Sequence, residues 1–176
     1  MKNNIDVEIC TFSLESCLNA QLAGASRVEL CSGMYDGGTT PSAAMIRMAR
    51  EKLSIQLYVM IRPRGGDFLY SDLEFEMMKE DIRFAKACRA DGVVLGILNA
   101  DGSVDVRRTR ELVELAAPLK VTFHRAIDMT RDMEEALEGI IEAGCYRVLT
   151  SGGRNTVNEG MERIKALVKQ AGGRVQ

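Results

Sequence analysis

The sequence has no tryptophan, only one histidine and only three prolines among its 176 residues, and it contains no CxxC pair. The missing CxxC pair removes support for a zinc knuckle or a thioredoxin-like redox motif. No apolar run approaches the length that spans a bilayer, and residues 1–6 lack the hydrophobic segment of a secretory signal. A formal charge of -2 gives no electrostatic reason to expect nucleic acid or an anionic membrane as a partner. These absences predict a cytoplasmic protein that binds neither nucleic acid nor membranes.

Five cysteines are present, which is an odd number for a chain in which no export signal is recognisable. A disulfide framework is therefore not expected, and the thiols should be reduced. Hydrophobic residues make up 46% of the chain and charged residues 27%, as in an ordinary globular domain, and 176 residues suffice for one well-buried core. We expect residues 1–176 to form a single domain.

A pattern of short apolar strand, turn and amphipathic helix repeats along the chain. Thr40 followed by Pro41 marks one helix start, and Ser71 with Glu74 has the spacing of a capping box at another. Six such units in succession predict an α/β fold with parallel strands and right-handed crossovers. The predicted strands span residues 5–10, 27–31, 55–61, 92–96, 120–124 and 147–151, and the predicted helices span residues 13–23, 40–52, 71–89, 104–117, 131–143 and 156–171.

The two faces of the predicted strands differ in polarity. Val7–Cys10 recurs 21 residues later as Val28–Cys31, and in both copies a glutamate and a cysteine share one face while apolar residues share the other. A doubly wound sheet buries both faces of its central strands against helices, whereas a barrel can line its interior with polar side chains. The alternation therefore predicts a TIM (β/α)8-type barrel.

The predicted barrel is incomplete. Such a barrel needs roughly 250 residues, and this chain supplies about six βα units plus, at residues 172–176, the turn and first residues of a seventh strand. Either the chain is a fragment, or it covers its open edges in another way. Because an uncovered parallel edge strand invites pairing with another chain, we expect self-association into a homo-oligomer through the first and last strands.

Charged residues lie on the strand faces that would line the barrel. Glu8 and Glu29 fall on adjacent strands, with Arg62 at the end of the third strand as their natural counter-charge. The single histidine, His124, ends the fifth strand. TIM barrels take their catalytic residues from the C-terminal ends of several strands, so we predict a catalytic mouth formed by Glu8, Glu29, Arg62, His124, Arg125 and Asp128. The alternative is an ion-paired plug that only stabilises a narrow barrel.

Two cysteines share this interior face. Cys10 and Cys31 lie on the first two strands, and Met60 lies on the next. Two thiolates held close together suit a soft metal such as Cu(I), so we predict that Cys31 and Cys10 are copper ligands. The alternative is that both are small buried hydrophobes, which is the usual environment of a free cysteine.

A glycine-rich loop, Ser151–Gly152–Gly153, follows the sixth strand and leads into a helix. Backbone N–H groups in such a loop can bind a phosphate or a carboxylate, so we predict Ser151, Gly152 and Gly153 as a cofactor-binding loop. The alternative is a common glycine-rich turn.

Several motifs, in the same order, carry a resemblance to a known family. They are Val28–Cys31, Gly37–Ser42, Ile61–Phe68 with Tyr70, Asp91–Gly96, Val121–Asp128 and Leu149–Gly153. Through them the sequence resembles the CutC family of copper homeostasis proteins, which have a TIM-barrel fold. The resemblance implies a cytoplasmic, oligomeric protein linked to copper handling, with Cys31 in the family's second-strand motif and Cys10 as the less secure ligand. It implies that the charged residues named above line the barrel mouth, as in the family. It also implies that family members continue beyond Val175 to close the barrel.

Three functions are compatible with these residues. The leading hypothesis is a copper homeostasis protein that binds Cu(I) through the cysteines of the barrel interior. The second is a barrel enzyme acting on a small anionic metabolite, with His124 or a glutamate as general acid or base and with Arg62 and Arg125 holding a carboxylate or phosphate. The third is a chain that folds but is inactive.

Overall fold

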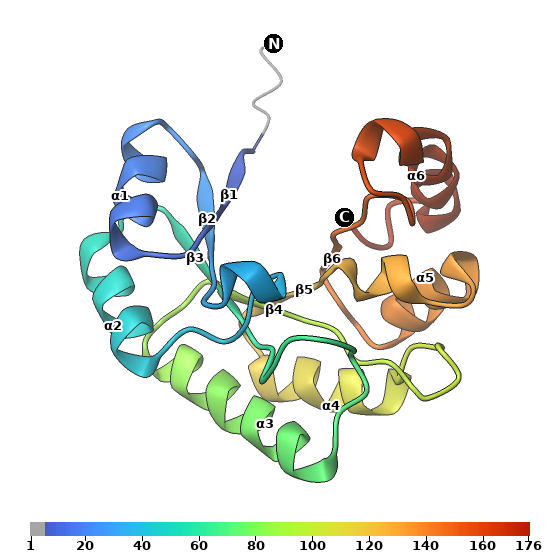
Figure 1. Cartoon of the computed structure of the whole chain (residues 1–176), viewed down its shortest axis with the longest axis horizontal. Helices are drawn as coiled ribbons and strands as arrows, with labels where there is room; N and C mark the ends of the chain where they lie inside the picture. The colour runs from blue at the N-terminus through green and yellow to red at the C-terminus, as the bar shows by residue number, and fades with distance from the viewer. Residues whose placement is uncertain (1–5) are drawn as a thin grey trace.

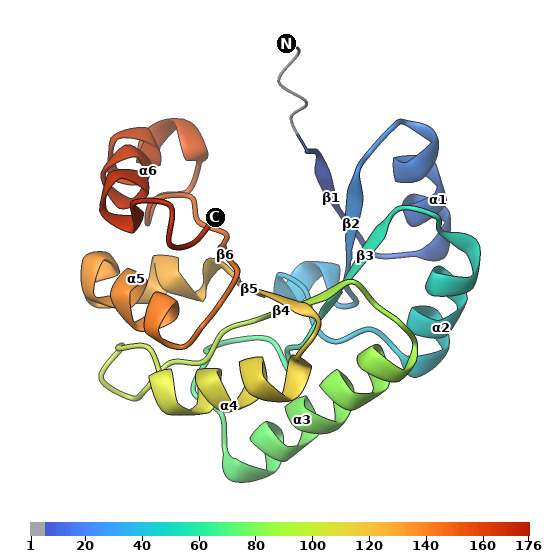
Figure 2. The same ribbon diagram turned by 180° about the vertical axis from the view of Figure 1, so that it is seen from behind.

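Within residues 6–176, which the computed structural model of the chain describes, six strands form one parallel sheet in the order of the sequence. The sheet curls, six helices cover its outer side as an arc, and the first and last units do not meet (Figures 1 and 2). This half-barrel is the fold that the alternating strand faces predict. The strands are β1 (Glu8–Thr11), β2 (Arg27–Leu30), β3 (Gln56–Met60), β4 (Gly92–Leu95), β5 (Lys120–Phe123) and β6 (Arg147–Val148).

One helix separates each strand from the next, as predicted, and a sixth follows β6. No helix in the described part of the chain is long and apolar enough to cross a membrane. The capping box of Ser71 and Glu74 is confirmed, and two short 3₁₀ helices, η1 (Met34–Asp36) and η2 (Arg125–Met129), occupy loops that the sequence pattern leaves irregular. The α-helices are α1 (Leu14–Leu22), α2 (Ala43–Lys52), α3 (Asp72–Ala87), α4 (Val106–Ala116), α5 (Met133–Glu142) and α6 (Val157–Ala171).

The predicted start of α2 at Thr40 and Pro41 is wrong. Ser42 caps this helix, because its hydroxyl accepts a hydrogen bond from the Met45 N–H at 3.2 Å. The Thr40 hydroxyl instead accepts the backbone N–H of Arg62 at 2.9 Å. Thr40 thus ties the loop after β2 to the end of β3, where the polar mouth begins.

The edges of the sheet differ in detail from the prediction. β1 begins later than predicted, and Ile5 lies outside the described residues. β6 is short, but Gln176 continues the sheet beside it: the Gln176 N–H donates to the Tyr146 carbonyl at 3.1 Å, and the Val148 N–H donates to the Gln176 carbonyl at 2.8 Å. This is the pairing of an adjacent parallel strand. The last residues therefore lie where the predicted seventh strand starts.

Strand residues alternate between a face covered by helices and an interior face. Val28, Leu57 and Val93 point to the helices and are fully buried, which gives the apolar core between sheet and helices. The interior face combines an apolar cluster, in which Tyr58, Met60 and Val94 take part, with charged residues. Arg27 and Glu29 lie on this face with only 6% and 5% of their surface exposed. Buried charged side chains such as these need nearby ion-pair or hydrogen-bond partners. The side chains that provide them form the site.

Two glycines of the β4 segment shape the interior. A Cβ at Gly92 would collide with the Tyr58 ring, and a Cβ at Gly96 would collide with the His124 ring. Tyr58 pairs with Gly92 in the β3–β4 register, so its ring can lie across the neighbouring strand. The missing side chains on β4 therefore make the space that the two rings occupy.

Candidate functional site

A cavity of about 320 Å³ lies on the interior face of the curled sheet. β1 and β2 contribute Glu8, Cys10 and Glu29, and the ends of β3 and β5 contribute Arg62 and His124. Arg125, directly after His124, also lines it, so the structure brings six predicted site residues to one cavity. Apolar side chains complete much of its wall, namely Met60, Phe68 and Leu149.

Cys10, Glu29 and Cys31 form the tightest cluster at this cavity. The sulfurs of Cys10 and Cys31 lie 3.7 Å apart, and a carboxylate oxygen of Glu29 lies 3.4 Å from the Cys31 sulfur and 4.0 Å from the Cys10 sulfur. Metal–thiolate bonds are about 2.3 Å long, so two sulfurs at this separation can share one ion. Within residues 6–176 this is the group of three whose ligand atoms all lie within 4.8 Å of one another.

The protonation of the cluster follows from its burial. Burial, together with the nearby Glu8 carboxylate, raises the pKa of Glu29 to about 7. A hydrogen bond from Cys31 lowers the pKa of the Cys10 thiol, while that bond to Cys10 and burial raise the pKa of Cys31. Cys10 is the exposed member and the more acidic of the two thiols, whereas Glu29 and Cys31 are buried. The cluster therefore offers one accessible thiol, that of Cys10, next to two buried potential metal ligands, Glu29 and Cys31.

The predicted counter-charge of the glutamates is wrong. The guanidinium of Arg27, rather than that of Arg62, forms the ion pair with Glu8. Arg27 also lies over the Tyr58 ring at 4.9 Å from the centroid. Its position two residues before Glu29 puts it on the interior face, which is a signal that the sequence contained. Arg62 is consequently left for another partner.

Arg62 holds the loops around the mouth through their carbonyl groups. It donates to the carbonyls of Asp36 at 2.6 Å, Gly38 at 2.9 Å and Gly66 at 2.8 Å. Its guanidinium carbon lies 4.8 Å from the centroid of the Phe68 ring. Arg62 is only 5% exposed, and its Nε has no hydrogen-bond partner among the described residues.

His124 caps η2 with its ring. Its Nδ1 accepts the Ala126 N–H at 3.2 Å, so in the neutral imidazole the proton is on Nε2. That Nε2 is buried and has no partner among the described residues. Burial and the positive charge of Arg62 lower the pKa of His124 to about 3. At ordinary pH His124 is therefore neutral, with its N–H on Nε2.

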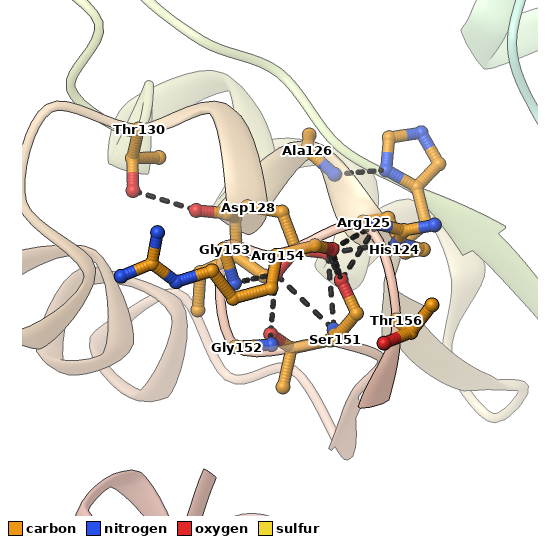
Figure 3. A network of polar contacts seen from close by, with 12 residues as sticks. His124, Arg125, Ala126, Asp128, Thr130, Ser151, Gly152, Gly153, Arg154 and Thr156 are labelled. Carbon is orange, nitrogen blue, oxygen red and sulfur yellow. Dashed lines mark hydrogen bonds and ion pairs between the residues drawn. The ribbon is translucent and has the colours of Figure 1, made fainter. Parts of the chain in front are cut away.

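A second polar network surrounds Asp128 beside the mouth (Figure 3). Its carboxylate accepts from Arg125 Nε at 2.8 Å, from the N–H of Ser151 at 3.1 Å, from the Ser151 hydroxyl at 3.0 Å and from the N–H of Gly153 at 3.0 Å. The Thr150 hydroxyl donates to the same carboxylate. Although burial acts in the opposite direction, the hydrogen bonds from Thr150 and Arg125 keep the pKa of Asp128 below its ordinary value.

The N–H groups of the predicted anion-binding loop thus have internal partners. Those of Ser151 and Gly153 donate to Asp128, and that of Gly152 donates to the Thr150 hydroxyl at 2.8 Å. The Asp128 carboxylate occupies the place that an external anion would take. Cofactor binding by Ser151, Gly152 and Gly153 stays a prediction, and this arrangement gives it no support.

Several functional contacts had weak signals in the sequence. Phe68, which packs against both Arg62 and His124, lies in a loop outside any periodic element. Leu149 and Thr150 belong to the predicted sixth strand and to the family motif, but the structure ends β6 at Val148 and places both residues in the loop that follows. The catalytic role assigned to the six charged mouth residues also stays a prediction. All of them except Asp128 line the cavity, and Arg125 also connects the cavity to the Asp128 network.

Comparison with known proteins places these residues in a family. The sequence profile of the CutC family matches residues 5–176. A CutC family protein of Chromobacterium violaceum is 54% identical over 169 residues, which cover 96% of this chain and 68% of that protein. A mouse protein described as a copper homeostasis protein cutC homolog is 51% identical over 173 residues, which cover 98% of this chain and 64% of the mouse protein. The chain thus spans about two thirds of the length of these relatives.

Solved structures agree with this relationship. The crystal structure of a CutC copper homeostasis protein from Streptococcus agalactiae superposes with a TM-score of 0.92 at 37% identity, over 98% of this chain and 85% of that one. An aldolase, QR15, superposes with a TM-score of 0.73 at 16% identity, which shows a shared fold alone. The half-barrel is therefore a TIM-barrel fold, and the chain belongs to the CutC family.

Proposed function

We propose that this chain acts in copper homeostasis by binding Cu(I) between the thiolates of Cys10 and Cys31. The observation that carries the proposal is the 3.7 Å separation of the two sulfurs, one on β1 and the other directly after the adjacent strand β2. Thiolates are soft ligands that select Cu(I) over hard cations. The relatives from mouse and human are described as copper homeostasis proteins, which supports the same cargo here.

The third position at the ion is assigned to Glu29. Its carboxylate lies within 4.0 Å of both sulfurs and has no lysine or arginine ion pair among the described residues. The Met60 thioether is the competing third ligand, because the Met60 methyl group and the Cys31 sulfur border the same position above Gly38. Two thiolates and a carboxylate would leave the ion with one accessible side, the side of Cys10.

The exposure of the cluster would allow transfer of the Cu(I) ion to or from another protein. Cys10 is exposed and Cys31 is buried, so a donor or acceptor protein can reach the ion through Cys10 while Cys31 retains it. None of the five cysteines forms a disulfide, in keeping with a reducing compartment such as the cytoplasm. Cytoplasmic location and assembly into a homo-oligomer are parts of this proposal.

The test is an anaerobic competition titration with a Cu(I) chelator of known affinity. The unmodified chain should bind one Cu(I) stoichiometrically, and Cys10→Ser/Cys31→Ser should lose it. Cys88→Ser is the matched control, because it removes a thiol of intermediate exposure at the end of α3, away from the cavity. Glu29→Gln should weaken binding by less than the double cysteine change if the carboxylate is the third ligand.

Two further results decide the proposal. Circular dichroism must show that each variant folds, and a parallel titration with Zn(II) tests metal selectivity. Tight Cu(I) binding that survives in a folded Cys10→Ser/Cys31→Ser variant would contradict the thiolate site. Tighter binding of Zn(II) than of Cu(I) would contradict copper as the cargo.

A further inference from the structure

Arg62 is a buried cation without an anion. It forms no ion pair with any carboxylate of residues 6–176, although only 5% of its surface is exposed. The carbonyls of Asp36, Gly38 and Gly66 accept from its Nη atoms, but carbonyl dipoles carry no net charge. Buried charges in proteins are normally paired, because an uncompensated one costs several kcal/mol. The unpaired guanidinium therefore needs an explanation.

His124 presents a second incomplete contact in the same cavity. The Nδ1 of its ring is taken by the Ala126 N–H, which places the proton on Nε2, and that buried Nε2–H has nothing to donate to among the described residues. Gly96 leaves the space in which the ring is fixed. The ring is thus held in one orientation and one tautomer, and its Nε2–H has no partner within the protein. This arrangement is typical of a side chain that contacts a ligand.

The two incomplete contacts belong to one place. Arg62 and His124 both line the 320 Å³ cavity, and Phe68 packs against both, at 4.8 Å from the Arg62 guanidinium carbon and 4.9 Å from the His124 ring. The Nε of Arg62 and the Nε2 of His124 are both buried and without partners among residues 6–176. The buried Tyr70 hydroxyl lies beside Arg62, and burial raises its pKa although the Arg62 charge acts against that rise. Because this hydroxyl is neutral, it does not supply the missing negative charge.

We propose that Arg62 and His124 bind a small organic carboxylate in this cavity. The guanidinium supplies the charge, and the Nε2–H of His124 donates to an oxygen of the ligand. Met60, Phe68 and Leu149 would contact its apolar part, which favours an organic acid over inorganic phosphate. This inference does not depend on copper: the carboxylate lies at the β3–β5 side of the cavity, and the thiols lie at the β1–β2 side.

The proposal gives His124 a different role from that of a general base. A neutral imidazole held in the Nε2–H form polarises a bound oxygen by donating a hydrogen bond, without giving up its proton. Arg125, whose guanidinium is already engaged by Asp128 and Ser151, is a rim residue and not the main anion contact. The anion selectivity of the cavity thus rests on Arg62.

The test uses the only histidine as a reporter. Because the chain has a single histidine, ¹⁵N-labelled protein gives one set of imidazole signals, which report tautomer, protonation and ligand contact without assignment. The protein, kept reduced and free of metal, is titrated with pyruvate, malonate and inorganic phosphate at constant ionic strength. We expect a neutral Nε2–H ring from about pH 5 to about pH 8, and a saturable shift of Nε2 with at least one organic carboxylate.

Variants separate the contacts by ligand-observed NMR. Arg62→Met and His124→Phe should each weaken carboxylate binding by about tenfold or more, the cost of a charged hydrogen bond. Arg64→Met is the matched control: it removes a charge two residues away that pairs with Asp67 and Glu74 outside the cavity, and it should leave affinity unchanged. Arg62→Lys, which keeps the positive charge, is a second variant for use if Arg62→Met disturbs the loops.

The outcomes are decisive in both directions. Loss of binding in the Arg62 and His124 variants, with retention in Arg64→Met and in Cys10→Ser/Cys31→Ser, supports the site and separates it from the copper site. Failure of every carboxylate to give a saturable shift up to about 50 mM overturns it. A charged His124 at neutral pH, or tighter binding of phosphate than of any organic acid, overturns it as well.

Discussion

Glu29 and Asp128 are two carboxylates at the same barrel mouth, and their surroundings are opposite. Asp128 accepts hydrogen bonds from an arginine, two hydroxyls and two backbone N–H groups, and its pKa is lowered. Glu29 has two thiols as its side-chain donors, and burial raises its pKa to about 7. Asp128, whose hydrogen-bonding capacity is filled, stabilises the fold, whereas Glu29, which has few donors, is available to bind a ligand.

The same contrast holds for the two arginines of the mouth. Arg125 is half-exposed and paired with Asp128, while Arg62 is buried and unpaired among the described residues. The β5–β6 side therefore holds the complete network, and the β1–β3 side with the ring of His124 holds the incomplete contacts. Substitutions on one side or the other should therefore have different effects.

The largest effect is expected from Asp128→Ala. Removing the carboxylate leaves the Ser151 and Gly153 N–H groups and the Thr150 hydroxyl without their acceptor, so the free energy of unfolding should fall by about 3 to 5 kcal/mol. Chemical denaturation monitored by circular dichroism measures the change. A loss below about 1 kcal/mol would show that the network is not structural.

The pH dependence of stability should differ in sign between the two carboxylates. The pKa of Glu29 is raised in the folded state from 4.5 to about 7, so the folded chain binds more protons over this range and loses stability as the pH rises through it. The loss should reach on the order of 3 kcal/mol by about pH 8. The lowered pKa of Asp128 acts oppositely, because its stabilisation disappears as the pH falls through that pKa.

Glu29→Gln is the control for this prediction. In metal-free protein, the free energy of unfolding of the variant should no longer fall between pH 4.5 and about 7. The loss of stability at low pH, which is assigned to Asp128, should remain. Denaturant titrations at a series of pH values provide the measurement. A decline of equal size in the variant would assign it to another group.

Gly96→Ala should destabilise the chain by about 1 to 3 kcal/mol, because the added methyl group overlaps the His124 ring. The effect should largely disappear when His124→Ala is combined with it, since the second change removes the overlapping ring. A double-mutant cycle of unfolding free energies measures the coupling. Additive effects of the two changes would argue against a ring fixed by Gly96.

The smallest effect is expected from Arg125→Met. The Arg125 side chain is 53% exposed, so its ion pair with Asp128 is screened by water, and its removal should cost less than about 1 kcal/mol. Thermal unfolding compared with Asp128→Ala measures the difference. A cost as large as that of Asp128→Ala would mean that the charge, rather than the backbone N–H groups, holds Asp128.

Much of the fold and the thiol cluster could be predicted from local patterns. The repeat of Val7–Cys10 at Val28–Cys31 placed a glutamate and a cysteine on the same face of adjacent strands, and the structure brings Glu29 and both sulfurs together. Such a prediction succeeds because a parallel pair fixes the register of its side chains. Self-association through the edge strands stays a prediction.

The partners of the charged residues could not be predicted in the same way. Arg62 bonds to carbonyls of two separate loops, and Asp128 accepts two backbone N–H groups after β6, and backbone partners of this kind do not depend on side-chain type. The error at Thr40 has a related cause. Proline is common at the first helical position, but here Pro41 precedes the cap, and the helix begins after Ser42.

The strictly sequential strand order also bears on how the two proposed sites assemble during folding. Each strand pairs only with its neighbours along the chain, so the contacts are formed by successive short crossovers and not by distant closure. The cluster of Cys10, Glu29 and Cys31 requires only the docking of β1 on β2. The pair of Arg62 and His124 requires the third, fourth and fifth strands as well. A nascent chain could therefore hold a metal ion before it could hold an organic acid.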